Sequence, residues 1–579
     1  MLKTEGTEHK KPGMLALAWN RLGLYFRPIT LVPGVLTASF IYAVMSLFRQ
    51  RPMVGALVLY MAHRLHFAYA HHPQLYRALH RSLFNMAKHI PAIGELLEDQ
   101  LGPIIKGLED DNFAPLEEGN FRFLTLPEQG ISEERILAEL DAIAEIAGGE
   151  NARQKLSGAI YTGKTDFHSE INKRLLGINV MHKHLWPRLV DAENQSVAMC
   201  LKLYNAPAEA WGKTTAGGSL SIYEALSAYA NQAKASFNTA PHIVLSDRAH
   251  SSFKKAAKQL GMSYTEVPVN PLTYQVDLKK MRAAIQPSTV LLVASAPAFP
   301  EGIMDDIEAV STMALEQGIG CHMDACLGGG LLPFAQKVGL DLPACSFELP
   351  GVTSISADLH KFFEAPKGHS LVMFRDEELA AHGIYTDLQS KMGMYGTAGI
   401  EGSRPPRVAG WAVLLSMGVE GYAENLRGMM EIKNTIVRAI EGNEIPGLVI
   451  CGKPLLPIFA LKSIDPDLDI FLVASHMKSE YGWSLHALPE PAVHLCVTPR
   501  HLLTPGTADI FLKNLEASVA YAKENKGLEP AASLKMYDTF KHEVPDAVAD
   551  PVLQDVGEAY FLIEGSAERR RTDRKMKRA

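Results

Sequence analysis

Short apolar runs rich in β-branched residues alternate with helical patterns through the middle of the chain. The apolar runs predict strands at residues 243–246, 264–269, 290–295, 320–325, 353–356 and 371–374. Apolar residues at helical spacing fill several gaps between them, at residues 250–260, 278–285 and 306–317. Strands separated by helices need crossover connections, so we expect a mainly parallel sheet covered by helices on both faces. Such sheets bind ligands at the carboxyl ends of their strands.

The flanking regions show different patterns. Helical patterns at residues 408–417 and 423–440, followed by strand-like runs at 448–451, 458–461 and 493–497, predict a smaller α+β lobe. Tyr481, Trp483 and Leu488 could line an acyl channel there, although such clusters more often form core. We therefore expect five parts. They are an N-terminal membrane-associated helical segment (1–110), a connector and arm (111–205), a large cofactor-binding domain (206–406), a small domain (407–545) and a C-terminal extension (546–579).

The N-terminal segment contains a long apolar run. Residues 28–48 are 21 uncharged residues bounded by Arg27 and Arg49, close to the roughly 20 that a helix needs to cross a bilayer. Pro28 and Pro33 lie within this run, so a buried or interfacial helix remains the alternative to a transmembrane helix. We expect membrane association, through a single-pass anchor if the run spans, with the catalytic part on the cytoplasmic side.

Composition narrows the function classes. The chain has 579 residues, of which 47% are hydrophobic and 21% charged, so it can bury a large core. The net charge of −7 gives no electrostatic case for nucleic-acid binding, and the basic tail at residues 568–579 is either a solvated end or a contact for anionic lipid. Six scattered cysteines indicate reduced thiols and no zinc site, and the histidines at residues 63–72 lack companions for a metal site.

Four features lie where a parallel sheet would bind a ligand. A Gly-rich turn at residues 214–219 opens a helical pattern whose free N–H groups would suit a phosphate. His250 follows a strand and could stack on a planar ring, and Asp324 ends a strand, where it could hold a protonated ring nitrogen. Lys361 follows another strand and could be a Schiff-base nucleophile in a pocket that lowers its pKa. Each has a commoner structural use alone, but together and in this order they predict a pyridoxal 5′-phosphate site.

Longer motifs around these residues resemble the sphingosine-1-phosphate lyase family, within the group II pyridoxal-phosphate decarboxylase superfamily. The matching motifs are residues 157–163, 179–182, 322–329, 354–361, 365–368 and 402–405. The resemblance spans residues 150–540 and is specific, because amino-acid decarboxylases in general lack the pieces at 325–329 and 365–368. It implies an aspartate-aminotransferase-like fold of type I and a homodimer with shared active sites. It also implies retro-aldol cleavage of a phosphorylated long-chain amino alcohol to phosphoethanolamine and a fatty aldehyde.

The resemblance also implies roles for individual residues. Lys361 would carry the cofactor, Asp324 would hold the pyridinium nitrogen and His250 would stack on the ring. The other cofactor-binding residues would be Gly217, Gly218, Ser219, His360 and, from the partner chain, Ser403. The residues expected at or near the substrate phosphate are Tyr161, Asn179, His182, Lys367 and Tyr537. A dianionic head group needs several cationic and hydroxyl donors, which this set contains.

The chain departs from the family's pattern at the Gly-rich turn. Residues 216–221 lack a carboxylate and a methyl group that the family usually has, and Ala296, Phe363 and Gly399 replace polar residues. Each replacement removes a polar group expected near the cofactor, so the substrate is less determined than the cofactor. Two alternatives to the lyase stay open: a decarboxylase of another amino acid, and a non-catalytic, membrane-anchored lipid-phosphate binder on the same fold.

Overall fold

The computed structural model describes residues 127, 129–144, 154–157, 165–180, 184–387, 389, 391, 395–399 and 407–530. The chain divides into two compact units, residues 1–143 with 529–579 and residues 144–528. In the first unit the main described element is helix α6 (Glu133–Ala144). No helix among the described residues is long and apolar enough to cross a membrane. The predicted segment at 28–48 and the basic tail lie outside them.

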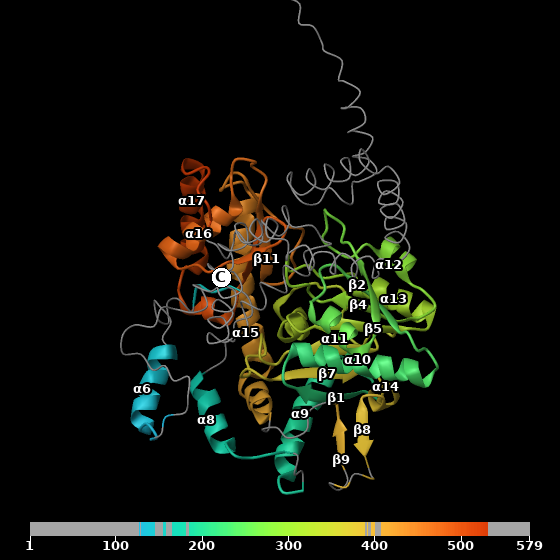
Figure 1. The fold of residues 1–579 in the computed structure, drawn as a ribbon. Coiled ribbons are helices and arrows are strands. Elements are labelled where there is room, and N and C mark those ends of the chain that lie inside the picture. The colour runs from blue at the N-terminus through green and yellow to red at the C-terminus, as the bar shows by residue number, and fades with distance from the viewer. Residues whose placement is uncertain are drawn as a thin grey trace, which may run out of the picture. The chain divides into compact units, whose positions relative to one another are not determined.

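A seven-stranded sheet forms the centre of the second unit (Figure 1). Its strands are β1 (Trp211–Thr215), β2 (His242–Ser246), β3 (Ser263–Val267), β4 (Thr289–Ser295), β5 (Gly320–Ala325), β6 (Ser354–Ala357) and β7 (Ser370–Phe374), in the order β1-β7-β6-β5-β4-β2-β3. Neighbours from β3 to β6 are parallel, and only β7 runs in the opposite direction. The mainly parallel sheet is confirmed.

Helices pack on this sheet because its strands are apolar on both faces. The helices are α9 (Pro187–Leu203), α10 (Gly218–Ala235), α11 (Ser252–Leu260), α12 (Leu278–Ala284), α13 (Ile307–Gln317) and α14 (Glu377–Ala381). Helix α8 (Thr165–Leu175) precedes them and contacts α15. Ile243, Leu245 and Leu291 pack in one core cluster with residues of α10 and α11. Val244 and Leu292 alternate with them along the strands and are equally buried, so the opposite face is covered too.

The remaining elements connect and extend the sheet. Between β5 and β6 the chain forms three short 3₁₀ turns, η1 (Gly328–Gly330), η2 (Leu332–Phe334) and η3 (Gln336–Val338). A separate hairpin consists of β8 (Ile384–Asp387) and β9 (Tyr395–Ala398). Its strands follow α14 in sequence.

The expected α+β lobe follows in the same unit. Its elements are α15 (Val408–Glu441), β10 (Leu448–Ile450), β11 (Ile458–Ser463), α16 (Ile470–Tyr481), β12 (His486–Leu488), β13 (Ala492–Cys496), η4 (Pro499–Leu503) and α17 (Thr507–Glu524). The strands form an antiparallel sheet in the order β10-β11-β13-β12, and Figure 1 shows α16 and α17 beside it. The two predicted helices before it are confirmed: α15 consists of two helical stretches joined at Gly418, whose φ of 57° and ψ of 179° are not helical.

Trp483 belongs to the core of this lobe. Its side chain is 1% exposed, and its ring stacks on His501 and meets Phe511 edge to face at a centroid distance of 5.0 Å. The alternative of an acyl channel lined by Trp483 is therefore wrong, because a ring packed on both sides has no surface left for a ligand.

Candidate active site

Asp324 and Lys361 are brought to one edge of the large sheet by adjacent strands. Strands β5 and β6 are parallel, and Asp324 near the end of β5 pairs in register with Ser356 of β6. Lys361 follows the end of β6. Because the carboxyl ends of parallel strands lie at one edge, the predicted nitrogen partner and the predicted nucleophile come together there.

The Asp324 carboxylate is buried and hydrogen-bonded on one side only. It is 7% exposed, and its Oδ1 accepts hydrogen bonds from the Cys326 backbone N–H at 3.0 Å and the Ser356 hydroxyl at 3.1 Å. Within the described part of the chain, no hydrogen bond reaches its Oδ2. An ionised carboxylate oxygen accepts hydrogen bonds, so Oδ2 is suited to pair with a protonated nitrogen of a ligand.

His322 supports this carboxylate through Ser356. Its ring is fully buried between two serines, with Nδ1 at 2.7 Å from Ser354 Oγ and Nε2 at 3.1 Å from Ser356 Oγ. The single proton of the Ser356 hydroxyl goes to Asp324, so His322 must donate from Nε2. Burial lowers the pKa of His322 to about 4, which keeps the ring neutral near pH 7. The sequence did not indicate these roles of His322 and Ser356. Ser354 and Ser356 are two residues apart on one strand, which places their side chains on the same face of the sheet.

Lys361 makes an ion pair that the sequence did not reveal. Its Nζ lies 3.0 Å from Oδ2 of Asp358, and its side chain is 17% exposed. Burial by itself lowers the Lys361 pKa, but the Asp358 carboxylate, with a smaller contribution from Asp324, outweighs burial and raises the pKa above its usual value. The expectation of a pocket that lowers this pKa is therefore wrong for the structure, because the nearest group is a buried opposite charge.

The Gly-rich turn forms the start of α10. Gly217 has a φ of 147°, and no side chain caps the helix. A Cβ on Gly218 would lie 2.8 Å from both Asp358 carboxylate oxygens, so only glycine lets the turn lie this close to the strand ends. The first N–H groups of a helix point outward without intrahelical partners, and together they suit a phosphate.

Ser219 and His250 stand beside this turn. The hydroxyls of Ser219 and Ser252 are 2.6 Å apart and join the first turns of α10 and α11. His250, which is exposed, accepts a hydrogen bond at its Nδ1 from the Ser252 backbone N–H at 3.2 Å. The imidazole predicted to stack on a ring is thus placed beside the predicted phosphate cradle.

Lys367 is exposed on the loop that leads from Lys361 into β7. The neighbouring His369 is buried and donates from Nδ1 to the Pro366 carbonyl at 2.9 Å. Burial lowers the pKa of His369 to about 4, so this ring is neutral near pH 7. This neutral ring anchors the loop that carries Lys367.

The rest of this loop is held by α15. The Tyr422 hydroxyl donates to the Phe363 carbonyl at 2.9 Å, and Asn425 donates to the Glu364 carboxylate at 2.6 Å. The Phe363 ring is fully buried and meets the rings of Phe334 and Tyr422 edge to face. The Phe363 departure is therefore accommodated by an aromatic cluster, where a hydroxyl would need a partner.

The structure describes part of the predicted substrate-phosphate set. Asn179 is half-buried just after α8. Tyr161, His182, Tyr537 and the expected partner residue Ser403 lie outside the described residues.

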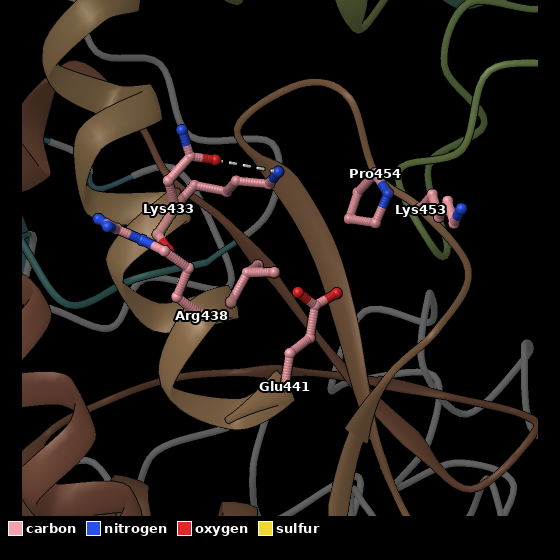
Figure 2. Close-up of a pocket in the computed structure, with 7 residues that line it drawn as sticks. Lys433, Arg438, Glu441, Lys453 and Pro454 are labelled. Carbon is pink, nitrogen blue, oxygen red and sulfur yellow. Dashed lines mark hydrogen bonds between the residues drawn. The ribbon is translucent and has the colours of Figure 1, made fainter. Parts of the chain in front are cut away.

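A cavity of about 610 Å³ lies elsewhere, at the end of α15 (Figure 2). It is lined by Lys433, Asn434, Val437, Arg438, Glu441, Lys453 and Pro454. Lys433 is buried and bonds to the Asn434 side-chain oxygen at 3.3 Å. Figure 2 shows Lys433 directed toward the loop of Lys453 and Pro454, and Arg438 directed the other way. None of these residues belongs to the large sheet, so the cavity is separate from the candidate active site.

The residues at the strand ends fit pyridoxal 5′-phosphate. The uncapped start of α10 offers a cradle for its phosphate, and the open oxygen of Asp324 faces no competing donor in the described part of the chain. Lys361 supplies an amine at the same edge. The groups that the cofactor needs are present, and none of the described residues fills their place.

Comparison with known proteins agrees with this site. The family description "Pyridoxal-dependent decarboxylase conserved domain" matches residues 165–460. Sphingosine-1-phosphate lyases of Dictyostelium discoideum and Drosophila melanogaster are 32% and 34% identical to this chain, over 81% and 80% of its length and 87% and 85% of theirs. The sphingosine-1-phosphate lyase structure of Burkholderia pseudomallei matches with a TM-score of 0.65 and 33% identity, covering 74% of this chain and 97% of that one. A Lactobacillus brevis glutamate decarboxylase shares the fold, with a TM-score of 0.60 and 18% sequence identity. This match covers 70% of this chain and 97% of the decarboxylase chain.

Proposed function

This chain belongs to the sphingosine-1-phosphate lyase family, and we propose that it cleaves a phosphorylated long-chain amino alcohol of the sphingosine 1-phosphate type to phosphoethanolamine and a fatty aldehyde. It is a lyase that depends on pyridoxal 5′-phosphate. The observation that carries the proposal is the convergence of Asp324, Lys361 and the uncapped start of α10 at one sheet edge. The alternative of an amino-acid decarboxylase is not favoured, because the relatives that match over most of the chain are lyases.

The residues of this site divide the work of binding and proton control. When bound, pyridoxal 5′-phosphate supplies an electron sink for the electron pair of the broken carbon–carbon bond. The N–H groups at the start of α10 would hold its phosphate, and Asp324 Oδ2 would keep its ring nitrogen protonated. Lys361 would hold the cofactor through its amine. In the overall cleavage the substrate hydroxyl loses a proton to become the aldehyde, and the amine-bearing carbon gains one.

Product analysis tests the proposal. The purified protein with pyridoxal 5′-phosphate should convert sphingosine 1-phosphate or its dihydro form to a long-chain aldehyde, measured by mass spectrometry together with phosphoethanolamine. Carbon dioxide from an amino acid, with no aldehyde, would show a decarboxylase instead. A protein that binds the phosphorylated lipid but never forms the visible absorbance band of a lysine-bound cofactor would be a non-catalytic binder.

We expect Lys367→Ala to weaken use of the phosphorylated substrate without loss of the cofactor. A charge-assisted hydrogen bond to a phosphate contributes about 1.5–3 kcal/mol, so kcat/KM should fall roughly 10- to 100-fold, mainly through KM. Steady-state kinetics give these parameters, and the visible band reports the cofactor. Lys279→Ala, which removes an exposed cation of α12, is the matched control and should leave KM unchanged. An unchanged KM in Lys367→Ala would remove this residue from the phosphate site.

We further propose that the protein is a homodimer attached to a membrane through residues 28–48, with the catalytic part on the cytoplasmic side. The family resemblance at residues 402–405, which includes the expected partner residue Ser403, supports the dimer. The apolar run supports attachment, and six free cysteines agree with a reducing compartment. The full chain should sediment with membranes, and deletion of residues 1–50 should give a soluble dimer by light scattering. Full-length protein that stays soluble without detergent would contradict the membrane attachment. A monomeric deletion variant with full activity would contradict the homodimer.

A further inference from the structure

Asp358 is a buried carboxylate on which three donor side chains converge. It is 2% exposed, and its Oδ2 lies 3.0 Å from Lys361 Nζ and 3.5 Å from His360 Nε2. The Ser370 hydroxyl donates to its Oδ1 at 2.5 Å. A buried carboxylate is stable as an anion only when such partners compensate its charge, and Lys361 is the cationic partner here.

A chain of hydroxyls fixes this carboxylate from behind. Ser370 Oγ lies 2.8 Å from Ser221 Oγ, and Ser221 Oγ lies 2.6 Å from Thr215 Oγ1. Since the proton of Ser370 goes to Asp358, Ser221 must donate to Ser370 and Thr215 to Ser221. All three hydroxyl dipoles therefore point toward the carboxylate, and hydrogen bonds aligned in this way polarise one another.

We propose that Asp358 is a positioning residue, which holds the free Lys361 side chain as an ammonium group at one place beside the start of α10. The inference deepens the proposed function, and it rests on it for the identity of Lys361 as the amine that holds the cofactor. An ammonium group has no lone pair and must lose its proton before it can condense with an aldehyde and release water. Asp358 thus sets how much reactive amine exists at a given pH.

The other ionisable groups around Lys361 do not replace Asp358. Asp324 also favours the ammonium form but acts as a weaker influence than Asp358. The thiols of Cys326 and Cys496 are buried, which raises their pKa values and keeps them uncharged near neutral pH. The pKa of His360 is lowered, chiefly by burial, so its ring is neutral as well. Removal of the Asp358 charge should therefore lower the Lys361 pKa, and the fraction of free amine should rise.

A purely structural role for Asp358 has a different consequence. The carboxylate lies against Gly218 and the hydroxyl chain, so it could serve only to hold the first turn of α10. In that case Asp358→Asn and Ser370→Ala would both loosen the same contact and change Lys361 in the same direction. If Asp358 acts through its charge, the two variants act in opposite directions, because the loss of a donor leaves the carboxylate more strongly paired with Lys361.

The test is amine labelling of the full-length, cofactor-free protein across pH, with Lys361 followed by peptide mass spectrometry. At pH 8 we expect Asp358→Asn to speed labelling at least tenfold and to move the pH midpoint down, since an opposite charge shifts a pKa by roughly one unit or more. Ser370→Ala should slow labelling about threefold, within the range of one lost hydrogen bond. Labelling of Lys279, an exposed lysine, is the internal control and should not change.

The outcomes separate this inference from the proposed function. An unchanged or slower rate in Asp358→Asn, or a faster rate in Ser370→Ala, would overturn the role of Asp358. If Asp358→Asn does not fold, as judged by circular dichroism, the direction of change in Ser370→Ala decides alone. Added pyridoxal 5′-phosphate should form its visible band faster in Asp358→Asn than in the native protein. A labelling shift without any band in either protein would support Asp358 but contradict the assignment of Lys361 as the cofactor residue.

Discussion

Lys361→Ala is expected to abolish aldehyde formation and the visible band of the bound cofactor together. The side chain is the amine at the sheet edge shared with Asp324 and the start of α10. Without it no covalent link holds the cofactor between substrates, and the protein loses the group that can carry a proton at this point. Loss of a nucleophile and of a proton-transfer group together should lower kcat by about 10³-fold or more.

Absorbance and product formation are measured on the same preparation of Lys361→Ala. Borohydride reduction followed by peptide mapping should place the cofactor on Lys361 in the native protein and on no peptide in the variant. The matched control is Lys367→Ala on the same loop, which should keep the band. Reduction that labels another lysine in the native protein would show that the nucleophile has been assigned wrongly.

Asp324→Asn should have the second largest effect, with the cofactor still bound. The amide oxygen of asparagine can still accept from the Cys326 backbone and the Ser356 hydroxyl, so the fold around the strand end is kept. The other side of the amide then presents N–H donors to the ring nitrogen, which cannot stay protonated there. The ring becomes a poorer electron sink, and kcat should fall about 10²- to 10⁴-fold.

The control for Asp324→Asn is Asp305→Asn. Asp305 is also buried beside the sheet, where its carboxylate accepts from the backbone of Ser295 at 2.9 Å and of Val276 at 2.8 Å. Its loss should lower thermal stability and leave kcat of the folded protein nearly unchanged. Kinetics and a thermal melt on both variants separate the two effects. Equal losses of kcat in the two variants would contradict a chemical role for Asp324.

Much of the fold could be predicted from the chain because its signals are local. The buried strands β2 and β4 are continuous apolar runs bounded by polar residues, and the structure places them within a residue of the predicted limits. Strand β1 was missed because it contains only polar residues after Trp211 and Gly212. Its place is decided by pairing with β7, a partner far along the chain, which no local pattern reports.

Some features of the site could also be predicted from the sequence, whereas others could not. The order of motifs along the chain indicated Asp324, His250, Lys361 and the Gly-rich turn, because parallel topology places strand ends at one edge. The motif around Lys361 also contained Asp358, but nothing in its letters showed that this carboxylate turns back to the lysine at 3.0 Å. The sequence therefore suggested a lowered Lys361 pKa, whereas the structure shows a raised one.

The sequence by itself predicted the candidate reacting groups, and it determined the parallel sheet that gathers them and the family of the protein. Only the tertiary structure decided which charge Lys361 faces, how one oxygen of Asp324 is left open and how Ser370, Ser221 and Thr215 align behind Asp358. The physical reason is the distance along the chain over which each kind of interaction acts. Periodicity and turn chemistry act over a few residues, but the electrostatics of a buried site depend on groups from separate strands and helices, which approach one another only after the chain has folded.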